Sequence, residues 1–147
     1  MFPFTAKIYF TRYQKMRSKA RECAFKIIFA SLFAPEGEGF QRGIYKTFGL
    51  DEEERAYADR ILDCVSAHEN ELIEQLNALS VGFSDKRMFP ADKSLLLMAL
   101  AEINYFDDIP NVVAVDEAVG LAKKYSTEKS VGFVNGVLGA AINGGKE

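Results

Sequence analysis

The sequence predicts an all-α protein of about seven helices in two small packed helical bundles, at residues 18–80 and 91–142. Apolar residues recur three and four positions apart through most of the chain, which is the spacing of one helix face. No stretch of useful length alternates apolar and polar residues as a half-buried strand does. Clusters of proline, glycine and acidic residues interrupt the periodic segments, so we expect separate helices.

Length and composition indicate one soluble globular domain. The chain has 147 residues, enough for a single sizeable core, with 48% hydrophobic and 27% charged residues. No apolar run approaches the roughly 20 residues that a membrane-spanning helix needs. The N-terminus carries no cleavable signal pattern, so we expect a cytoplasmic protein. Residues 1–15 have no clear helical stripe and are expected to be a flexible extension before a domain at residues 16–147.

The first predicted helix covers residues 18–33. It is apolar over more than half of its circumference, which is typical of a helix that others pack against. The apolar positions are Ala20, Ala24, Phe25, Ile27, Ile28, Phe29, Leu32 and Phe33. Only the first turns are basic, with Arg17, Lys19 and Arg21, so this end is expected to present positive charge.

The middle of the chain is divided by local signals. A breaker cluster at residues 35–39 ends the first helix, and a short helix is expected at residues 40–48. Asp51 and Glu54 have the spacing of a capping box, in which each side chain bonds the other residue's backbone N–H. The helix that follows either bends near His68 or gives way there to another helix. A linker is expected at residues 81–90.

Three signals define the last helices. Asp92 is expected to cap a helix that ends near Phe106, and Pro110 suits the first turn of the next helix. Ser126 or Thr127 is then expected to start the last helix. Lysines and aromatic residues cluster around this joint: Lys123, Lys124, Tyr125, Lys129 and Phe133. By itself, this pattern favours ordinary core packing with solvated lysines, and it leaves open whether Phe133 is exposed or belongs to the core.

No arrangement typical of an enzyme was found in the sequence. There is no glycine-rich phosphate loop or nucleophile elbow, and the single histidine, His68, has no serine or cysteine at a telling spacing. Cys23 and Cys64 lie far apart in apolar stretches and are expected to be free, buried thiols. We therefore expect a binding protein without catalytic residues, cofactor or metal site.

The charge is distributed unevenly along the chain. Residues 1–26 hold seven bases and one acid, a local charge of +6, although the whole chain has a net charge of −3. A basic end on an acidic protein is typical of polyanion binding, but it serves equally well as a solubility feature.

Three stretches resemble the NusB family of bacterial transcription antitermination factors. They are RSKARECAFKIIF at residues 17–29, DKSLLLMALAEINYFDDIP at residues 92–110, and VDEAVGLAKKYSTEKSVGFVNGVL at residues 115–138. The resemblance covers most of residues 17–141 and is weakest at residues 35–89. It implies the same two-bundle, all-α fold that the periodicity predicts.

The resemblance also implies a function. Members of this family bind the boxA element of single-stranded RNA together with NusE, a protein of the small ribosomal subunit. The pair helps the RNA polymerase antitermination complex to transcribe rRNA operons processively. The RNA-binding residues that the resemblance and the basic clusters suggest are Arg17, Lys19, Arg21, Lys86, Arg87, Lys123, Lys124, Tyr125, Lys129 and Phe133. Asp92 and Glu102 are candidates for the contact with NusE, because acids complement a basic ribosomal protein.

Two departures from the family pattern bear on RNA affinity. Lys129 stands where relatives can have an acid, and Ser18 replaces a base of the basic first helix. Some family members self-associate, so a homodimer is possible. Two alternative interpretations remain: a helical protein-protein scaffold, or an RNA-binding accessory domain related to the NusB-like domains of rRNA methyltransferases, without catalysis.

Overall fold

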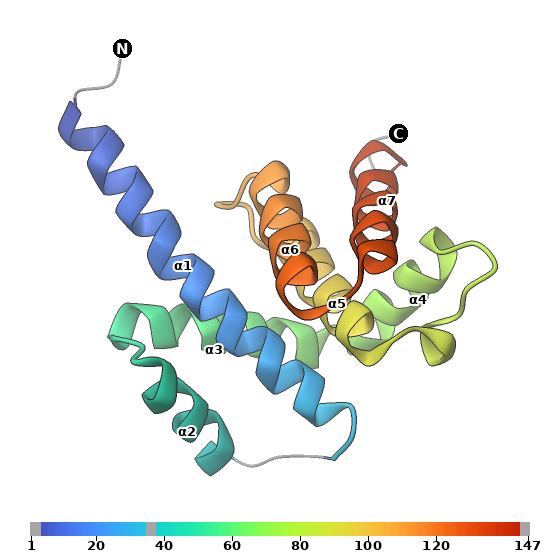
Figure 1. The fold of residues 1–147 in the computed structure, drawn as a ribbon, viewed down its shortest axis with the longest axis horizontal. Helices are drawn as coiled ribbons and strands as arrows, with labels where there is room; N and C mark the ends of the chain where they lie inside the picture. The colour runs from blue at the N-terminus through green and yellow to red at the C-terminus, as the bar shows by residue number, and fades with distance from the viewer. Residues whose placement is uncertain (1–3, 35–37, 145–147) are drawn as a thin grey trace. The chain divides into compact units, whose positions relative to one another are not determined.

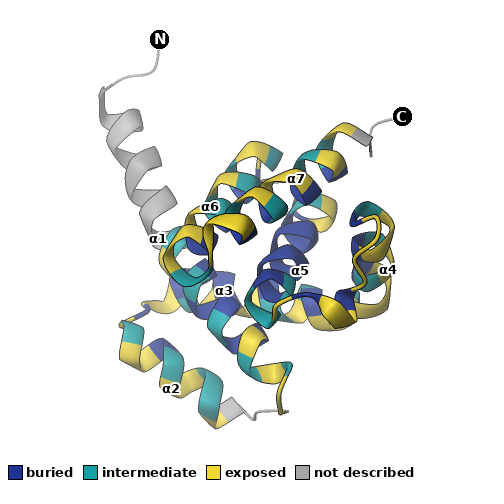
Figure 2. Cartoon of the chain, turned by 45° about the vertical axis from the view of Figure 1, so that its right-hand side comes forward, coloured by how far each residue is buried: buried dark blue, intermediate teal, exposed yellow. Residues whose placement is uncertain are grey.

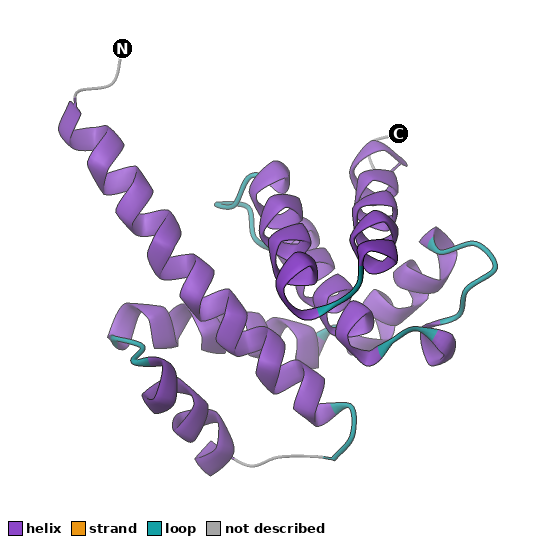
Figure 3. Cartoon of the chain, viewed as in Figure 1, coloured by secondary structure: helices purple, strands orange, loops and turns teal. Residues whose placement is uncertain are grey.

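The computed structural model describes residues 4–34 and 38–144, and it describes side-chain burial for residues 17–34 and 39–143. Within those ranges the only regular elements are helices, so the all-α prediction is confirmed (Figures 1 and 3). The elements are α1 Phe4–Ser31, α2 Glu38–Phe48, α3 Glu52–Ala67, α4 Glu69–Leu79, the short 3-10 helix η1 Asp85–Arg87, α5 Pro90–Tyr105, α6 Asn111–Tyr125 and α7 Glu128–Gly144.

The chain divides into two compact units, Met1–Arg60 and Ile61–Glu147. The boundary therefore falls inside α3, and not near residue 80 as the sequence predicts. The reason lies in α4, whose buried Leu72 and Leu76 contribute to the second unit, where α4 packs against α5 and α7.

Helix α1 is longer than the sequence predicts, because it begins at Phe4 and not at Ser18. The prediction relied on an apolar stripe, which residues 4–17 lack. These residues contain no proline or glycine, so nothing in the backbone stops a helix there, and extending a helix costs far less than nucleating one. Residues 1–3 of the expected extension lie outside the described residues.

In the first unit, α1 packs against α2. The described part of α1 buries Ala20, Cys23, Ala24 and Ile27. Helix α2 ends at Phe48 and is followed by Gly49, whose φ of +66° suits a residue without a Cβ atom. The Leu50 N–H donates to the Tyr45 carbonyl across this turn at 3.0 Å.

Helix α3 starts with the predicted capping box. The Glu54 backbone N–H donates to Asp51 Oδ1 at 2.8 Å, and the Asp51 N–H donates to Glu54 Oε1 at 2.9 Å. This reciprocal pair satisfies two backbone donors that a helix start otherwise leaves without partners.

In the second unit, α5 packs against α4, α6 and α7. Residues 94–102 are all buried, so most of α5 is dark blue in Figure 2. A helix that is apolar on every side belongs at the centre of a fold, and α5 therefore forms the core of this unit. It begins with Pro90 in its first turn, so the prediction that Asp92 caps it is wrong: Phe89 is the N-cap, and Asp92 lies inside the first turn.

Two contacts that involve polar side chains add to the apolar packing between α4 and α5. His68, at the break between α3 and α4, stacks on Tyr105 with ring centroids 3.8 Å apart and planes 10° apart. Asn104 Nδ2 donates to Gln75 Oε1 at 2.6 Å. The predicted break near His68 is thus confirmed, and the histidine has a packing role.

Candidate nucleic-acid interface

Asp92 fixes the joint between α6 and α7. Its carboxylate accepts hydrogen bonds from Ser126 Oγ at 3.0 Å and from Ser130 Oγ at 2.8 Å. Thr127 Oγ1 accepts the Ser130 backbone N–H at 3.1 Å, as the N-cap of α7. Asp92 and Ser130 are only 4% and 2% exposed, so these charge-assisted bonds are shielded from water and hold the joint against α5.

The fixed joint carries three exposed lysines. Lys123 and Lys124 lie in the last turn of α6, and Lys129 lies in the first turn of α7. Tyr125 is half-buried between them, and Lys124 Nζ is 5.4 Å from its ring centroid, within the range of a cation–π contact. Cations in the last turn of a helix also interact favourably with the helix dipole.

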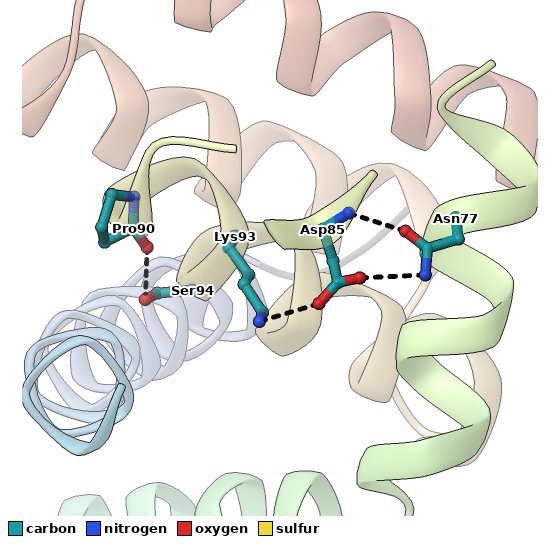
Figure 4. Close-up of polar contacts among 5 residues, drawn as sticks. All are labelled: Asn77, Asp85, Pro90, Lys93 and Ser94. Atoms are coloured by element: carbon teal, nitrogen blue, oxygen red, sulfur yellow. Dashed lines mark hydrogen bonds and ion pairs between the residues drawn. The ribbon is translucent and has the colours of Figure 1, made fainter. Parts of the chain in front are cut away.

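The linker between α4 and α5 is anchored by a second aspartate (Figure 4). Asp85 accepts hydrogen bonds from Asn77 Nδ2 on α4 and from Lys93 Nζ on α5, both at 3.0 Å. Its own backbone N–H donates to Asn77 Oδ1 at 2.7 Å. The hydrogen bond from Asn77, and then the ammonium of Lys93, hold the pKa of this carboxyl below its ordinary value, against the opposite effect of its burial.

This anchor keeps Lys86 and Arg87 exposed on η1. The linker also reaches α7, because the rings of Phe83 and Phe133 lie with centroids 5.7 Å apart. Phe133 is half-buried, which answers the question of exposure that the sequence left open. Within the second unit, the Phe83–Phe133 contact therefore links the basic linker to the helix that carries Lys129.

Two arginines of α1, Arg17 and Arg21, contact Tyr57 of α3. The guanidinium carbon of Arg17 is 4.8 Å from the Tyr57 ring centroid. Arg21 Nη2 donates to Tyr57 Oη at 3.2 Å, and Arg21 is only 1% exposed. The expectation that Arg21 presents its charge at the surface is therefore wrong. No local pattern indicates this role of Tyr57, which lies 36 residues further along the chain than Arg21.

Of the three bases Arg17, Lys19 and Arg21 on α1, Lys19 is the exposed one. Its ammonium lies 3.4 Å from the Gly49 carbonyl, at the outer limit of a hydrogen bond. In the first unit, Lys19 thus presents its charge to solvent, and the half-buried Arg17 presents part of its own.

The two acids proposed for the NusE contact are buried. Asp92 is 4% exposed and holds the joint, while Glu102 is 1% exposed in the last turns of the core helix α5. Their burial contradicts the expectation that they contact NusE, because a buried side chain is not accessible to a partner protein. The sequence pattern misled because an acid in a helix usually lies on its solvated face.

The described residues hold no cluster of three or more histidine, cysteine or acidic side chains suited to a metal ion. Neither Cys23 nor Cys64 forms a disulfide, and Cys64 is only half-buried, unlike the fully buried Cys23. Burial, and then the neighbouring Glu22 carboxylate, raise the pKa of Cys23 to about 11, so its thiol is protonated at neutral pH and is a poor nucleophile. No helix in the described part of the chain is long and apolar enough to cross a membrane.

The sequence model of the NusB family matches residues 18–143. The chain belongs to the NusB family. Its relatives in this family include the transcription antitermination protein NusB of Limosilactobacillus fermentum, 38% identical over 127 residues that cover 84% of this chain and 90% of the relative. The NusB protein of Agathobacter rectalis is 38% identical over 125 residues, covering 83% of this chain and 95% of that protein.

Solved NusB structures share the fold. T. maritima NusB superposes with a TM-score of 0.75 at 27% identity, covering 84% of this chain and 87% of that chain. A structure of the antitermination factors NusB and NusE in complex with dsRNA matches with a TM-score of 0.78, covering 86% of this chain and 95% of that chain. At 24% identity, this second likeness shows the NusB fold alone.

Proposed function

We propose that this chain is a transcription antitermination factor that binds boxA-type single-stranded RNA together with NusE. Its relatives at 38% identity are transcription antitermination proteins, and a solved complex of the same fold contains NusB, NusE and dsRNA. The protein acts by binding and not by catalysis, as part of an RNA polymerase antitermination complex on rRNA operons in the cytoplasm.

The observation that carries the RNA-binding proposal is the α6–α7 joint. Single-stranded RNA is bound through phosphate contacts with cations and through bases that stack on aromatic faces. The joint offers exposed lysines on either side of a tyrosine, on a backbone that Asp92 holds in place. Because the joint is fixed before RNA arrives, little conformational entropy is lost on binding.

The proposed phosphate-binding residues fall into three groups. They are Lys123, Lys124 and Lys129 at the joint, Lys86 and Arg87 on η1, and Arg17 and Lys19 on α1. Tyr125 and Phe133 provide aromatic faces for bases. Arg21 has a different part in this proposal: its buried guanidinium positions Tyr57, over which Arg17 lies.

A filter-binding titration tests the proposal. We expect boxA RNA to bind more tightly than a scrambled RNA of the same composition, and more tightly still when NusE is added. Binding to neither RNA, with or without NusE, would instead favour a protein-protein scaffold.

Two substitutions separate charge from stacking at the joint. Lys124→Ala is expected to weaken binding to both RNAs and to reduce the slope of log affinity against log salt by about 0.7, the value for one phosphate contact with a single strand. Tyr125→Ala is expected to weaken binding about tenfold with an unchanged slope, because stacking involves no counterion release. Arg42→Ala, which removes an exposed charge from α2, is the control and should change neither quantity. Wild-type affinity in both joint variants would contradict the assignment of this surface.

A further inference from the structure

The linker at residues 81–89 exposes three large apolar side chains. Val81 is 92% exposed, Phe83 is 52% exposed and Phe89 is 64% exposed. Single exposed apolar residues are ordinary, but two phenylalanines on one short segment are a candidate contact surface. Neither phenylalanine has a role in the RNA surface described above.

The backbone holds Phe83 in a defined place. A turn at residues 80–83 is closed by the Phe83 N–H, which donates to the Ser80 carbonyl at 2.9 Å. Gly82 is the third residue of this turn, with a φ of +81° that disfavours any residue with a Cβ atom. Ser80 Oγ also lies 2.8 Å from the Phe83 carbonyl and 2.6 Å from that of Leu76, which ties the turn to the end of α4.

A second ring supports Phe83 on one side. The Phe133 centroid lies 5.7 Å away, and the two planes are inclined by 51°. This is an ordinary geometry for an attractive aromatic pair. Since about half of the Phe83 surface is still exposed, the ring can contact Phe133 and a further flat group together.

The charges beside this pair are positive. Lys86 and Arg87 follow Phe83 by three and four residues and are exposed, while Lys129 precedes Phe133 by one helical turn. The only acid between residues 81 and 89 is Asp85, whose carboxylate bonds Asn77 and Lys93 instead of facing solvent. An apolar peptide would gain nothing from three nearby cations, whereas a nucleic acid uses both the cations and the ring.

We propose that Phe83 is a base-stacking residue: with Phe133 behind it, the ring receives an unpaired base of single-stranded RNA while Lys86, Arg87 and Lys129 contact the adjoining phosphates. Phe89 offers a second exposed ring at the end of the same linker. This inference rests on the proposed RNA binding and extends it to a segment on which the sequence indicated only basic residues.

Tryptophan fluorescence gives a direct test, because the chain contains no tryptophan. Phe83→Trp introduces a single fluorophore, and Val81→Trp places the same fluorophore two residues away as a matched control. We expect a single-stranded boxA RNA to quench the emission of Phe83→Trp with the same midpoint as its filter-binding curve. Duplex RNA, whose bases are paired, should quench it far less, and Val81→Trp should respond little to either RNA.

Affinity measurements test the requirement for an aromatic ring. Phe83→Leu keeps an apolar side chain against Phe133 but removes the aromatic face, and it should lower the affinity about tenfold with an unchanged salt slope. Phe83→Tyr should retain wild-type affinity. Val81→Ala should also bind as the wild type does.

The outcomes separate this inference from the proposed function. If the wild type binds boxA RNA but Phe83→Leu binds equally well, or Phe83→Trp is quenched no more than Val81→Trp, the stacking role is wrong and the proposed function stands. If the wild type binds no RNA, with or without NusE, the proposed function itself fails.

Discussion

At the residue scale, two aspartates lie close to basic residues, but their carboxylates face away from solvent. Asp85 is followed directly by Lys86 and Arg87, yet its carboxylate bonds Asn77 and Lys93. Asp92 accepts two serine hydroxyls. Each carboxylate is thereby kept from opposing a polyanion, and each holds a basic segment in place.

Asp85 gives a prediction about stability and pH. Its pKa is lowered in the folded protein, so the ionised form stabilises the fold at pH values above its ordinary pKa of 3.8, and this contribution is lost as the pH falls through the lowered value. Asp85→Asn should therefore cost about 1–3 kcal/mol at pH 7, the usual cost of disrupting a charged hydrogen bond, and the difference should shrink below about pH 4.

Urea unfolding of the wild type and Asp85→Asn at pH 7, 5, 4 and 3 measures this difference. Asp116→Asn, which neutralises an exposed carboxylate on α6, is the control and should match the wild type at pH 7. A stability difference for Asp85→Asn that stays constant down to pH 3 would contradict the role assigned to its charge.

At the scale of elements, the α6–α7 joint depends on a residue from a third helix. The sequence between the two helices supplies the N-cap Thr127 and the lysines, but the hydrogen bonds from Ser126 and Ser130 end on Asp92 of α5. The joint is therefore positioned by tertiary contact as well as by its own turn.

Asp92→Ala tests that dependence. The substitution leaves the buried Ser130 hydroxyl without its acceptor, so the free energy of unfolding should fall by about 1–3 kcal/mol. RNA affinity should fall as well, because the lysines of the joint lose their fixed backbone. If Asp92 acted only through its charge, the substitution would raise RNA affinity, because removal of an acid favours polyanion binding.

Filter binding together with chemical unfolding distinguishes the two effects. Asp116→Ala removes an exposed acid from α6 and should bind RNA at least as tightly as the wild type. If Asp92→Ala binds RNA more tightly than Asp116→Ala does, Asp92 acts only through its charge and does not position the joint.

At the scale of the whole molecule, an acidic chain with a net charge of −3 is proposed to bind a polyanion. This is physically reasonable, because the Debye length is about 8 Å at physiological salt and local cations therefore count for more than the total charge. The proposed cations come from both units: Lys19 belongs to the first unit and Lys124 to the second.

Combined substitutions test whether both units contribute. Lys19→Ala and Lys124→Ala should each reduce the salt slope by about 0.7, and the double variant should reduce it by about 1.4, since each lysine replaces one set of counterions. Filter binding over a series of salt concentrations provides the measurement. If the double variant has the same slope as Lys124→Ala alone, Lys19 makes no phosphate contact with the RNA.

Local sequence patterns are sufficient to predict the all-α class, the break at His68, the capping box of Asp51 and Glu54, and the position of the lysine-rich joint. These features arise from contacts within a few residues, so spacing and residue type were enough to predict them. The start of α1 was missed because residues 4–17 form a helix without an apolar stripe.

The surface exposure of the charged residues depends on tertiary packing and cannot be read from local sequence patterns. Arg21 bonds Tyr57, 36 residues away, and Asp92 bonds serines 34 and 38 residues away, so no local pattern indicates that these charges are buried. The contact between Phe83 and Phe133 likewise joins two distant segments. Burial and partner choice depend on how the helices pack, and a one-dimensional pattern of charges does not contain that information.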